Sequence, residues 1–202
     1  MSTRIEIKPV SNPPVGATLM KTGQTISFRT GDDGDIEAGR ATSFFVLESN
    51  NPFSNTDRFT DTLGGQVYTN DIVIDWSTYN GTTVLGWQRI PFPALGDYDW
   101  DQAIDSALIY SISTFNTGWR VPNIAEYFSL FNWDNPSQNK MLYPPFNLDV
   151  SLWSSTTDIN DISIAFYSPG SPTVVHIGRQ DKTNFMKTLY IRTFTVSGTI
   201  LT

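Results

Sequence analysis

Apolar residues recur at helical spacing directly after a proline near the middle of the chain. Pro122 cannot lie inside a helix, whereas Asn123 can cap the first turn of a new helix, and Glu126 completes a capping box. The apolar positions that follow at i, i+3, i+4 and i+7 are Ile124, Tyr127, Phe128 and Phe131. The pattern therefore predicts that a strand or turn ending in Trp119-Arg120-Val121 leads into a short amphipathic helix that ends near Asn132.

A second helical pattern precedes this one. It begins at Asp99, and the segment from Phe115 to Gly118 ends it. Pairs of residues four positions apart form one stripe, which consists of Ala103, Ile104, Ala107, Leu108, Ser111 and Ile112. We expect this stripe to face the core.

The remaining apolar segments are short and are rich in β-branched and aromatic residues, which is typical of strands. Strands are predicted at 42–47, 67–76 and 82–90 before the helices, and at 152–155, 162–167, 173–177 and 189–196 after them. Asn80-Gly81 is a hairpin turn signal, and the segment from Phe59 to Gly65 is predicted to be a turn-rich connection. The order indicates an α+β domain with two short helices, antiparallel strands and a β-rich N-terminal segment.

The N-terminal residues differ from the rest in pattern. Residues 3–8 alternate polar and apolar positions, which predicts a short strand, and Pro9, Pro13 and Pro14 then interrupt regular structure. One interpretation is an attachment arm at 1–22 that docks a domain at 23–202 on a larger assembly. The alternative is an edge strand and loop of that same domain.

Composition narrows the function classes. Charged residues make up 16% of the 202 residues, against a typical quarter, and aromatic residues make up 13%. This is typical of a rigid β-rich surface or particle protein with an aromatic core. The net charge is -7 and the basic residues are scattered, so no basic face for nucleic acid is indicated. No apolar run reaches the roughly 18 residues of a membrane span, and the first residues lack a signal-peptide pattern, so we expect synthesis in a cytoplasm without membrane insertion.

One acidic turn raises the question of a metal. Asp32, Asp33, Asp35 and Glu37 lie within six residues. Their spacing does not match the EF-hand loop, and Asp and Gly are also ordinary turn residues. A solvated turn is the main interpretation, calcium binding is the alternative, and no other metal or cofactor is predicted.

An ordered set of motifs resembles a known family. The motifs are Trp100-Asp101-Gln102-Ala103, Gly118-Trp119-Arg120-Val121-Pro122-Asn123 with Glu126, Leu152-Trp153-Ser154-Ser155-Thr156, and Tyr190-Ile191-Arg192-Thr193. Over about residues 57–196 they resemble the C-terminal domain family of Legionella collagen-like protein, in the formylglycine-generating-enzyme branch of the C-type-lectin-like fold. Val121 and Tyr127 stand where leucine is usual.

The resemblance implies a scaffold that displays variable loops, often as a homo-oligomer, with a trimer favoured. It assigns structural roles to Trp119, Arg120, Glu126, Trp153 and Arg192. In physical terms, Arg120, Glu126 and Arg192 could form a partly buried charge network that ties the second helix to the last strands.

The catalytic chemistries of the fold are excluded by composition. The enzyme branch oxidises a substrate cysteine by means of its own cysteines, and this chain has none. The iron-dependent branch needs several histidines, and the chain has only His176. We therefore predict no catalytic residues and no enzyme activity. A glycan hydrolase is the alternative, because it needs only two suitably separated carboxylates among the 20 acidic residues.

The candidate ligand-binding residues lie on the loops after Trp153-Ser154-Ser155. They are Asp158, Asn160, Asp161, Tyr167, His176 and Arg179. We expect a non-enzymatic bacteriophage virion protein (head decoration, head fibre or tail-associated) whose partners are other virion proteins and a host-surface glycan or protein. The expected location is the virion; a secreted or surface bacterial adhesin domain is the alternative.

Overall fold

The structure is a computed structural model, and it describes residues 58–65, 72–93, 96–131, 146, 150–158, 160–169 and 177–202. The expected arm at 1–22, the acidic turn at 32–37, the predicted strands at 3–8 and 42–47, and His176 lie outside these residues.

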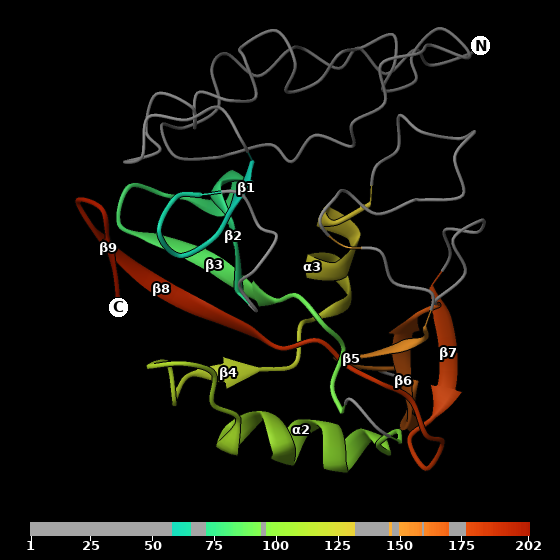
Figure 1. The fold of residues 1–202 in the computed structure, drawn as a ribbon. Coiled ribbons are helices and arrows are strands. Elements are labelled where there is room, and N and C mark those ends of the chain that lie inside the picture. The colour runs from blue at the N-terminus through green and yellow to red at the C-terminus, as the bar shows by residue number, and fades with distance from the viewer. Residues whose placement is uncertain are drawn as a thin grey trace, which may run out of the picture.

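The larger of the two described sheets is antiparallel, in the order β1-β2-β3-β8-β4, with β9 paired to β8 (Figure 1). Its strands are β1 (Phe59–Thr60), β2 (Ile72–Asp75), β3 (Thr83–Gln88), β4 (Trp119–Arg120), β8 (Ile191–Ser197) and β9 (Ile200–Leu201). Because β8 pairs with β3, the end of the chain returns to the strands that precede the helices. Helices and a second sheet are inserted between β3 and β8.

The connection from β2 to β3 contains a single turn of 3-10 helix, η1 (Trp76–Thr78), and then the predicted Asn80-Gly81 turn. The Asn80 side chain accepts hydrogen bonds from the backbone N–H groups of Thr82 and Thr83, at 3.0 and 2.8 Å. Gly81 has φ +96°, a conformation that favours glycine. The hairpin turn signal is therefore confirmed.

Both predicted helices are present, and each begins with a capping box. In α2 (Trp100–Ile109), Asp99 caps and Gln102 completes the box; in α3 (Ile124–Ser129), Asn123 caps and Glu126 completes it. The predicted ends are wrong, because α2 stops at Ile109 and α3 at Ser129. Leu108, expected on the core stripe, is 70% exposed, because the small side chains of Ala103 and Ala107 form the buried face of α2.

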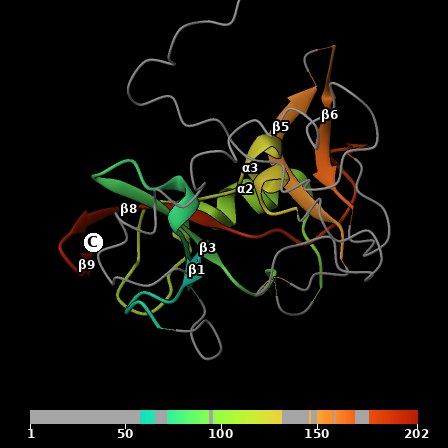
Figure 2. The same ribbon diagram turned by 90° about the horizontal axis from the view of Figure 1, so that it is seen from above.

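The second sheet has three antiparallel strands, β5 (Leu152–Asp158), β6 (Asp161–Ser168) and β7 (Gly178–Asp181), in that order. It lies at the end of the domain away from β9, and β5 and β6 extend outward from the body (Figure 2). The patterns at 152–155 and 162–167 predict β5 and β6, whereas β7 was not predicted.

Two buried clusters cover the two faces of the main sheet. Ile74, Val84 and Phe194 point towards α2, whose Ala103 and Ala107 close that side. On the other face, the second cluster includes Val73, Trp87, Ile191, Tyr127, Leu130 and Phe146. Strand alternation sends neighbouring residues to opposite faces, so both faces of the sheet are buried. The described part of the chain is an α+β fold with two short helices and a predominantly antiparallel, curled sheet.

Gly86 in β3 is required by close packing. A Cβ atom at this position would lie 2.3 Å from Cε2 of Phe194 and 3.1 Å from Cδ1 of Ile74. We expect Gly86→Ala to lower the free energy of unfolding by about 1–3 kcal/mol, because the Phe194 ring must move within a packed core. Urea denaturation measures the change.

A double variant provides the control. Phe194→Leu makes room next to position 86, so Gly86→Ala combined with Phe194→Leu should cost less than the sum of the two single changes. Additive costs, or a Gly86→Ala variant as stable as the parent chain, would contradict this packing arrangement.

Candidate recognition site

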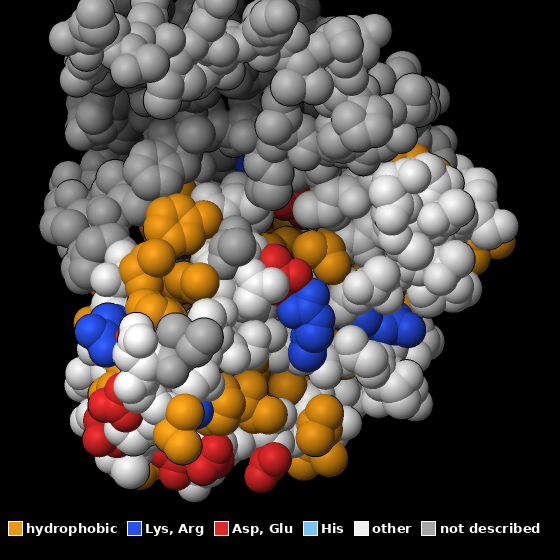
Figure 3. All heavy atoms as spheres, turned by 180° about the vertical axis from the view of Figure 1, so that it is seen from behind, with side chains coloured by type: hydrophobic (Ala, Val, Ile, Leu, Met, Phe, Trp, Pro, Cys, Tyr) orange, Lys and Arg blue, Asp and Glu red, His pale blue; other side chains and the backbone are white. Residues whose placement is uncertain are grey.

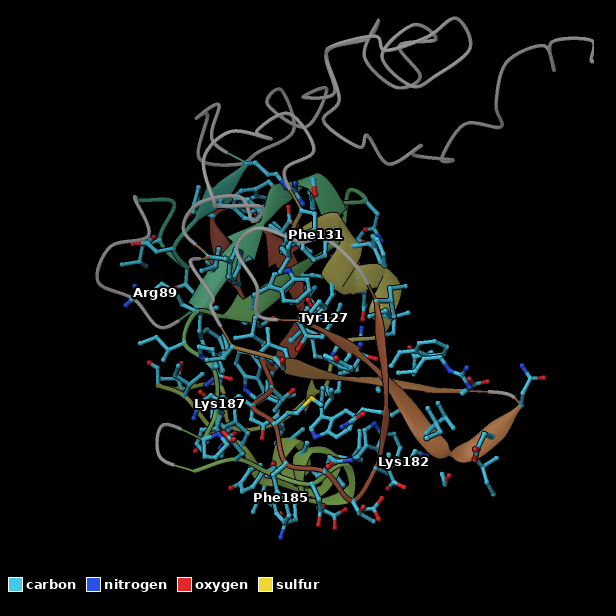
Figure 4. The ribbon with its side chains drawn as sticks, turned by 90° about the vertical axis from the view of Figure 1, so that its right-hand side faces the viewer. Arg89, Tyr127, Phe131, Lys182, Phe185 and Lys187 are labelled. Atoms are coloured by element: carbon cyan, nitrogen blue, oxygen red, sulfur yellow. The ribbon has the colours of Figure 1, made fainter. Side chains whose placement is uncertain are left out.

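The second sheet is attached to the domain by buried indole groups. Trp153 at the start of β5 is fully buried, and its Nε1 donates to the Tyr98 carbonyl at 3.0 Å. Trp100 of α2 donates from Nε1 to the Ser154 carbonyl at 2.8 Å, and Lys182 Nζ lies 3.9 Å from the centroid of the Trp100 ring. Figure 4 shows Lys182 and Phe185 at the α2 end and Tyr127 in the interior beneath α3. The base of the sheet is therefore held from two sides.

The β5–β6 turn brings two of the predicted residues together. Asp158 and Asp161 are paired across the hairpin, and the backbone N–H of Asn160 donates to Asp158 Oδ1 at 2.9 Å. Short polar residues that bond to the backbone two positions on favour such turns. The tip of the hairpin therefore carries three of the six predicted binding residues.

Asp158 and Arg179 form an ion pair that links the hairpin to β7. Asp158 is buried, with a side chain 6% exposed, whereas the Arg179 side chain is 57% exposed. The buried carboxylate thus holds one side of the guanidinium and leaves other N–H donors facing solvent. Arg179 is a fixed donor group on the outer face of the sheet.

Two exposed carboxylates lie next to this pair. Asp161 accepts from the Ser163 hydroxyl at 2.7 Å and from the Ser163 N–H at 3.0 Å, and these bonds, with the nearby Arg179, hold its pKa below the ordinary value. Asp181 has a lowered pKa because it accepts from the backbone N–H and hydroxyl of Thr183, at 2.9 and 2.7 Å. Because their pKa values are lowered, both carboxylates are ionised at neutral pH. The hydrogen bonds to Oδ1 of each carboxylate also fix its orientation.

An apolar stripe runs along β6 on the same face. Arg179 is opposite Phe166 and Asp181 is opposite Ile164, so these four side chains share one face of the sheet. Ile162 continues the stripe and is 81% exposed. The face therefore combines fixed donors and acceptors with a partly exposed apolar surface, which is typical of recognition surfaces.

Tyr167 lies on the opposite face from these groups. It is paired with Gly178, and a Cβ atom there would lie 1.9 Å from Cε1 of the Tyr167 ring. The ring also makes an edge contact with Trp153, with 6.5 Å between centroids. Of the predicted binding residues, Asp158, Asp161 and Arg179 are brought together, Asn160 is at the turn, Tyr167 packs against the core, and His176 lies outside the described residues.

The residues expected to be structural behave in two ways. Arg120 and Glu126 form a two-pronged ion pair, with N–O distances of 2.8 and 2.6 Å, and Glu126 also accepts from the N–H of Asn123. Trp119 is buried, and its indole Nε1 donates to the Phe115 carbonyl at 2.9 Å.

Arg192 does not join the Arg120–Glu126 pair: its guanidinium lies over the rings of Phe115 and Phe194. The expected three-residue charge network is therefore wrong, because β8 directs Arg192 towards the α2 side of the sheet.

Within the described ranges, no group of three His, Asp or Glu side chains is placed to hold a metal ion. None of the described helices is long and apolar enough to cross a membrane. On the face in Figure 3, acidic side chains lie among hydrophobic ones along the lower rim. In α2, the side chains of Asp101, Leu108 and Ile109 are exposed.

Asp181 and the apolar stripe were missed as site residues. The alternation of Ile162, Ile164 and Phe166 was the available signal, because period-two spacing places all three on one face of a strand. Asp181 had no comparable signal, because β7 lacks the β-branched and aromatic residues that indicate strands.

Comparisons with known proteins add no assignment. No protein family model, curated protein or solved structure matches this chain.

Proposed function

We propose that the chain is a non-enzymatic recognition protein that binds its ligand on the outer face of the β5–β6–β7 sheet. The observation that carries this proposal is the Asp158–Arg179 pair, with Asp181 on the same face as Arg179 and Asp161 at the adjacent hairpin turn. Polar groups already fixed by internal bonds lose little conformational entropy when a ligand binds. Such a surface suits a ligand that offers both hydrogen-bonding groups and apolar contact, such as a surface glycan or a protein loop.

We further propose that the domain is C-type-lectin-like and is displayed on a bacteriophage particle. The support is the ordered motif set, in which the Trp100, Trp119 and Trp153 motifs start α2, β4 and β5, together with two short helices followed by antiparallel strands. The low charge content is the second support. Mass spectrometry of purified particles tests this setting: the protein should be present in fixed proportion to the particle proteins, and its absence would contradict it.

Binding and turnover can be separated on one sample. We expect the purified chain to bind a subset of bacterial surface glycans or envelope proteins on an array, without release of reducing sugar. Release of reducing sugar that is lost in Asp161→Asn or Asp181→Asn would instead identify a glycan hydrolase and overturn the proposal. Absence of binding to every arrayed ligand, in a sample shown to be folded by circular dichroism, would also count against it.

A further inference from the structure

The turn between η1 and β3 carries the only Asn-Gly pair in the sequence, Asn80-Gly81. The backbone N–H of Asn80 donates to the Thr83 carbonyl at 3.1 Å, so the two residues close a four-residue turn in which Gly81 is second. Asn80, Gly81 and Thr82 are all exposed. A side-chain amide in such a turn lies close in sequence to a backbone nitrogen that can attack it.

The Asn80 side chain is held through its oxygen. Oδ1 accepts from the N–H of Thr82 at 3.0 Å, from the hydroxyl of Thr82 at 3.0 Å and from the N–H of Thr83 at 2.8 Å. The bond to the Thr82 N–H spans the peptide between Asn80 and Gly81, so it folds the side chain back over that peptide. The N–H of Gly81 takes no part in these bonds. The amide carbon Cγ is therefore held over the peptide whose nitrogen belongs to Gly81.

Gly81 leaves its nitrogen open to approach. A Cβ atom at this position would meet nothing within 4 Å, so there is open space beside the peptide for solvent. Because glycine has no side chain, the peptide can also adjust its rotation as Cγ approaches the nitrogen. In Asn116-Thr117, by contrast, a β-branched side chain follows the asparagine and hinders the same approach. Asn116 is exposed as well, so it serves as an internal reference.

The donors around Oδ1 suit both the reaction and its product. When a nitrogen attacks Cγ, negative charge develops on Oδ1, and three donors already aimed at that oxygen stabilise the charge. An aspartate at position 80 would keep all three bonds, because a carboxylate is an acceptor at both oxygens. Hydrogen bonds to a charged acceptor are stronger than those to an amide oxygen. The turn is therefore better matched to aspartate than to asparagine.

We propose that Asn80 is a site of spontaneous deamidation. The Gly81 nitrogen bonds to Cγ of Asn80, the Cγ–Nδ2 bond breaks, and Nδ2 leaves as ammonia with the proton that the Gly81 nitrogen gives up. Water then opens the cyclic imide: attack at Cγ leaves aspartate, and attack at the main-chain carbonyl carbon leaves isoaspartate. The product adds one negative charge to a chain of net charge -7. This site does not depend on recognition by the β5–β6–β7 surface.

Peptide mass spectrometry on the intact chain tests the reaction without a variant. The folded chain is incubated at neutral and mildly alkaline pH in water enriched in heavy oxygen, and is then digested. We expect Asn80 to exchange its NH2 group for a hydroxyl that carries heavy oxygen, faster at the higher pH, while Asn116 stays unchanged over the same period. An unchanged Asn80, or equal conversion of Asn116, would overturn the proposal. Faster conversion of Asn80 in urea than in the folded chain would show that the turn hinders the reaction, which contradicts the proposal.

One chemical change at two neighbouring positions tests the role of the donors. Thr82→Val removes the hydroxyl that donates to Asn80, whereas Thr83→Val removes a hydroxyl that is not one of the three donors to Oδ1. We expect Thr82→Val to slow conversion about two- to tenfold, which corresponds to one hydrogen bond, and Thr83→Val to leave the rate unchanged. Equal rates in the two variants would contradict assistance by the turn.

A direct replacement tests the product. Asn80→Asp is expected to raise the melting temperature by about 1–4 °C at neutral pH, because the carboxylate accepts the same three bonds more strongly. Those bonds favour the ionised form, so the gain should be lost as the pH falls far enough to protonate the carboxylate. A melting temperature below that of the parent chain at neutral pH would contradict the match between the turn and aspartate.

Discussion

Replacement of Asp75 by alanine is expected to lower the free energy of unfolding by about 3–5 kcal/mol, because it leaves a largely buried guanidinium without its counter-ion. Asp75 is fully buried and accepts from Arg58 Nε at 2.9 Å and from Arg58 Nη2 at 2.8 Å. It also accepts from the N–H and the hydroxyl of Ser77 in η1. Urea denaturation followed by tryptophan fluorescence measures the loss.

The Asp75 network also joins distant parts of the domain. Arg58 Nη2 donates to the Ser129 carbonyl at the end of α3, at 2.8 Å, so the pair connects β1, β2 and α3. Asp101→Ala removes an exposed carboxylate from α2 and is the matched control, with an expected change within about 0.5 kcal/mol. If Asp75→Ala costs no more than Asp101→Ala, the buried pair does not have the role assigned to it.

Replacement of Trp153 by alanine is expected to lower the free energy of unfolding by about 3–5 kcal/mol, through lost burial and the cavity left behind. Trp153 is fully buried, and its backbone N–H donates to the Lys187 carbonyl at 2.9 Å. Because the indole anchors β5 to the frame, backbone amides of β5 and β6 should also exchange faster with solvent. Urea denaturation and hydrogen-exchange mass spectrometry give the two readouts.

Trp153→Phe separates packing from hydrogen bonding. Phenylalanine keeps most of the ring but leaves the Tyr98 carbonyl without the indole donor, so a smaller loss of about 1–3 kcal/mol is expected. Equal losses for the alanine and phenylalanine variants would mean that ring packing is not the main contribution. Unchanged exchange in β5 and β6 would show that Trp153 does not anchor the second sheet.

The elements that could be predicted are those with local causes. Asp99 and Asn123 start α2 and α3 because their side chains bond to backbone groups three residues away, and sequence spacing alone reveals this. β7 could not be predicted, because Gly178–Asp181 is a strand through its pairing with β6 rather than through its composition. The exposure of Leu108 was missed because a helical stripe does not indicate which of its residues the small alanines bring against the sheet.

The candidate site was predictable only as a region. The turn-forming Asp158, Asn160 and Asp161 have a local signal, but the ion pair of Asp158 with Arg179 depends on the order of strands in the second sheet. The inward orientation of Tyr167 follows from its register opposite Gly178, which composition does not specify. The predicted network of Arg192 with Arg120 and Glu126 was wrong because strand register decides the neighbours of Arg192. These neighbours come from β3, β4 and the loop before β4.

The most direct test of recognition by the second sheet compares one chemical change at two positions. Arg179→Lys and Arg120→Lys each keep the charge opposite a carboxylate and remove the guanidinium fork. Affinity for whichever arrayed glycan or protein the parent chain binds is measured for both variants by surface plasmon resonance. We expect Arg179→Lys to weaken binding about tenfold, which corresponds to about 1.4 kcal/mol, and Arg120→Lys to leave it unchanged. Equal affinities for the two variants would contradict binding on the β5–β6–β7 face.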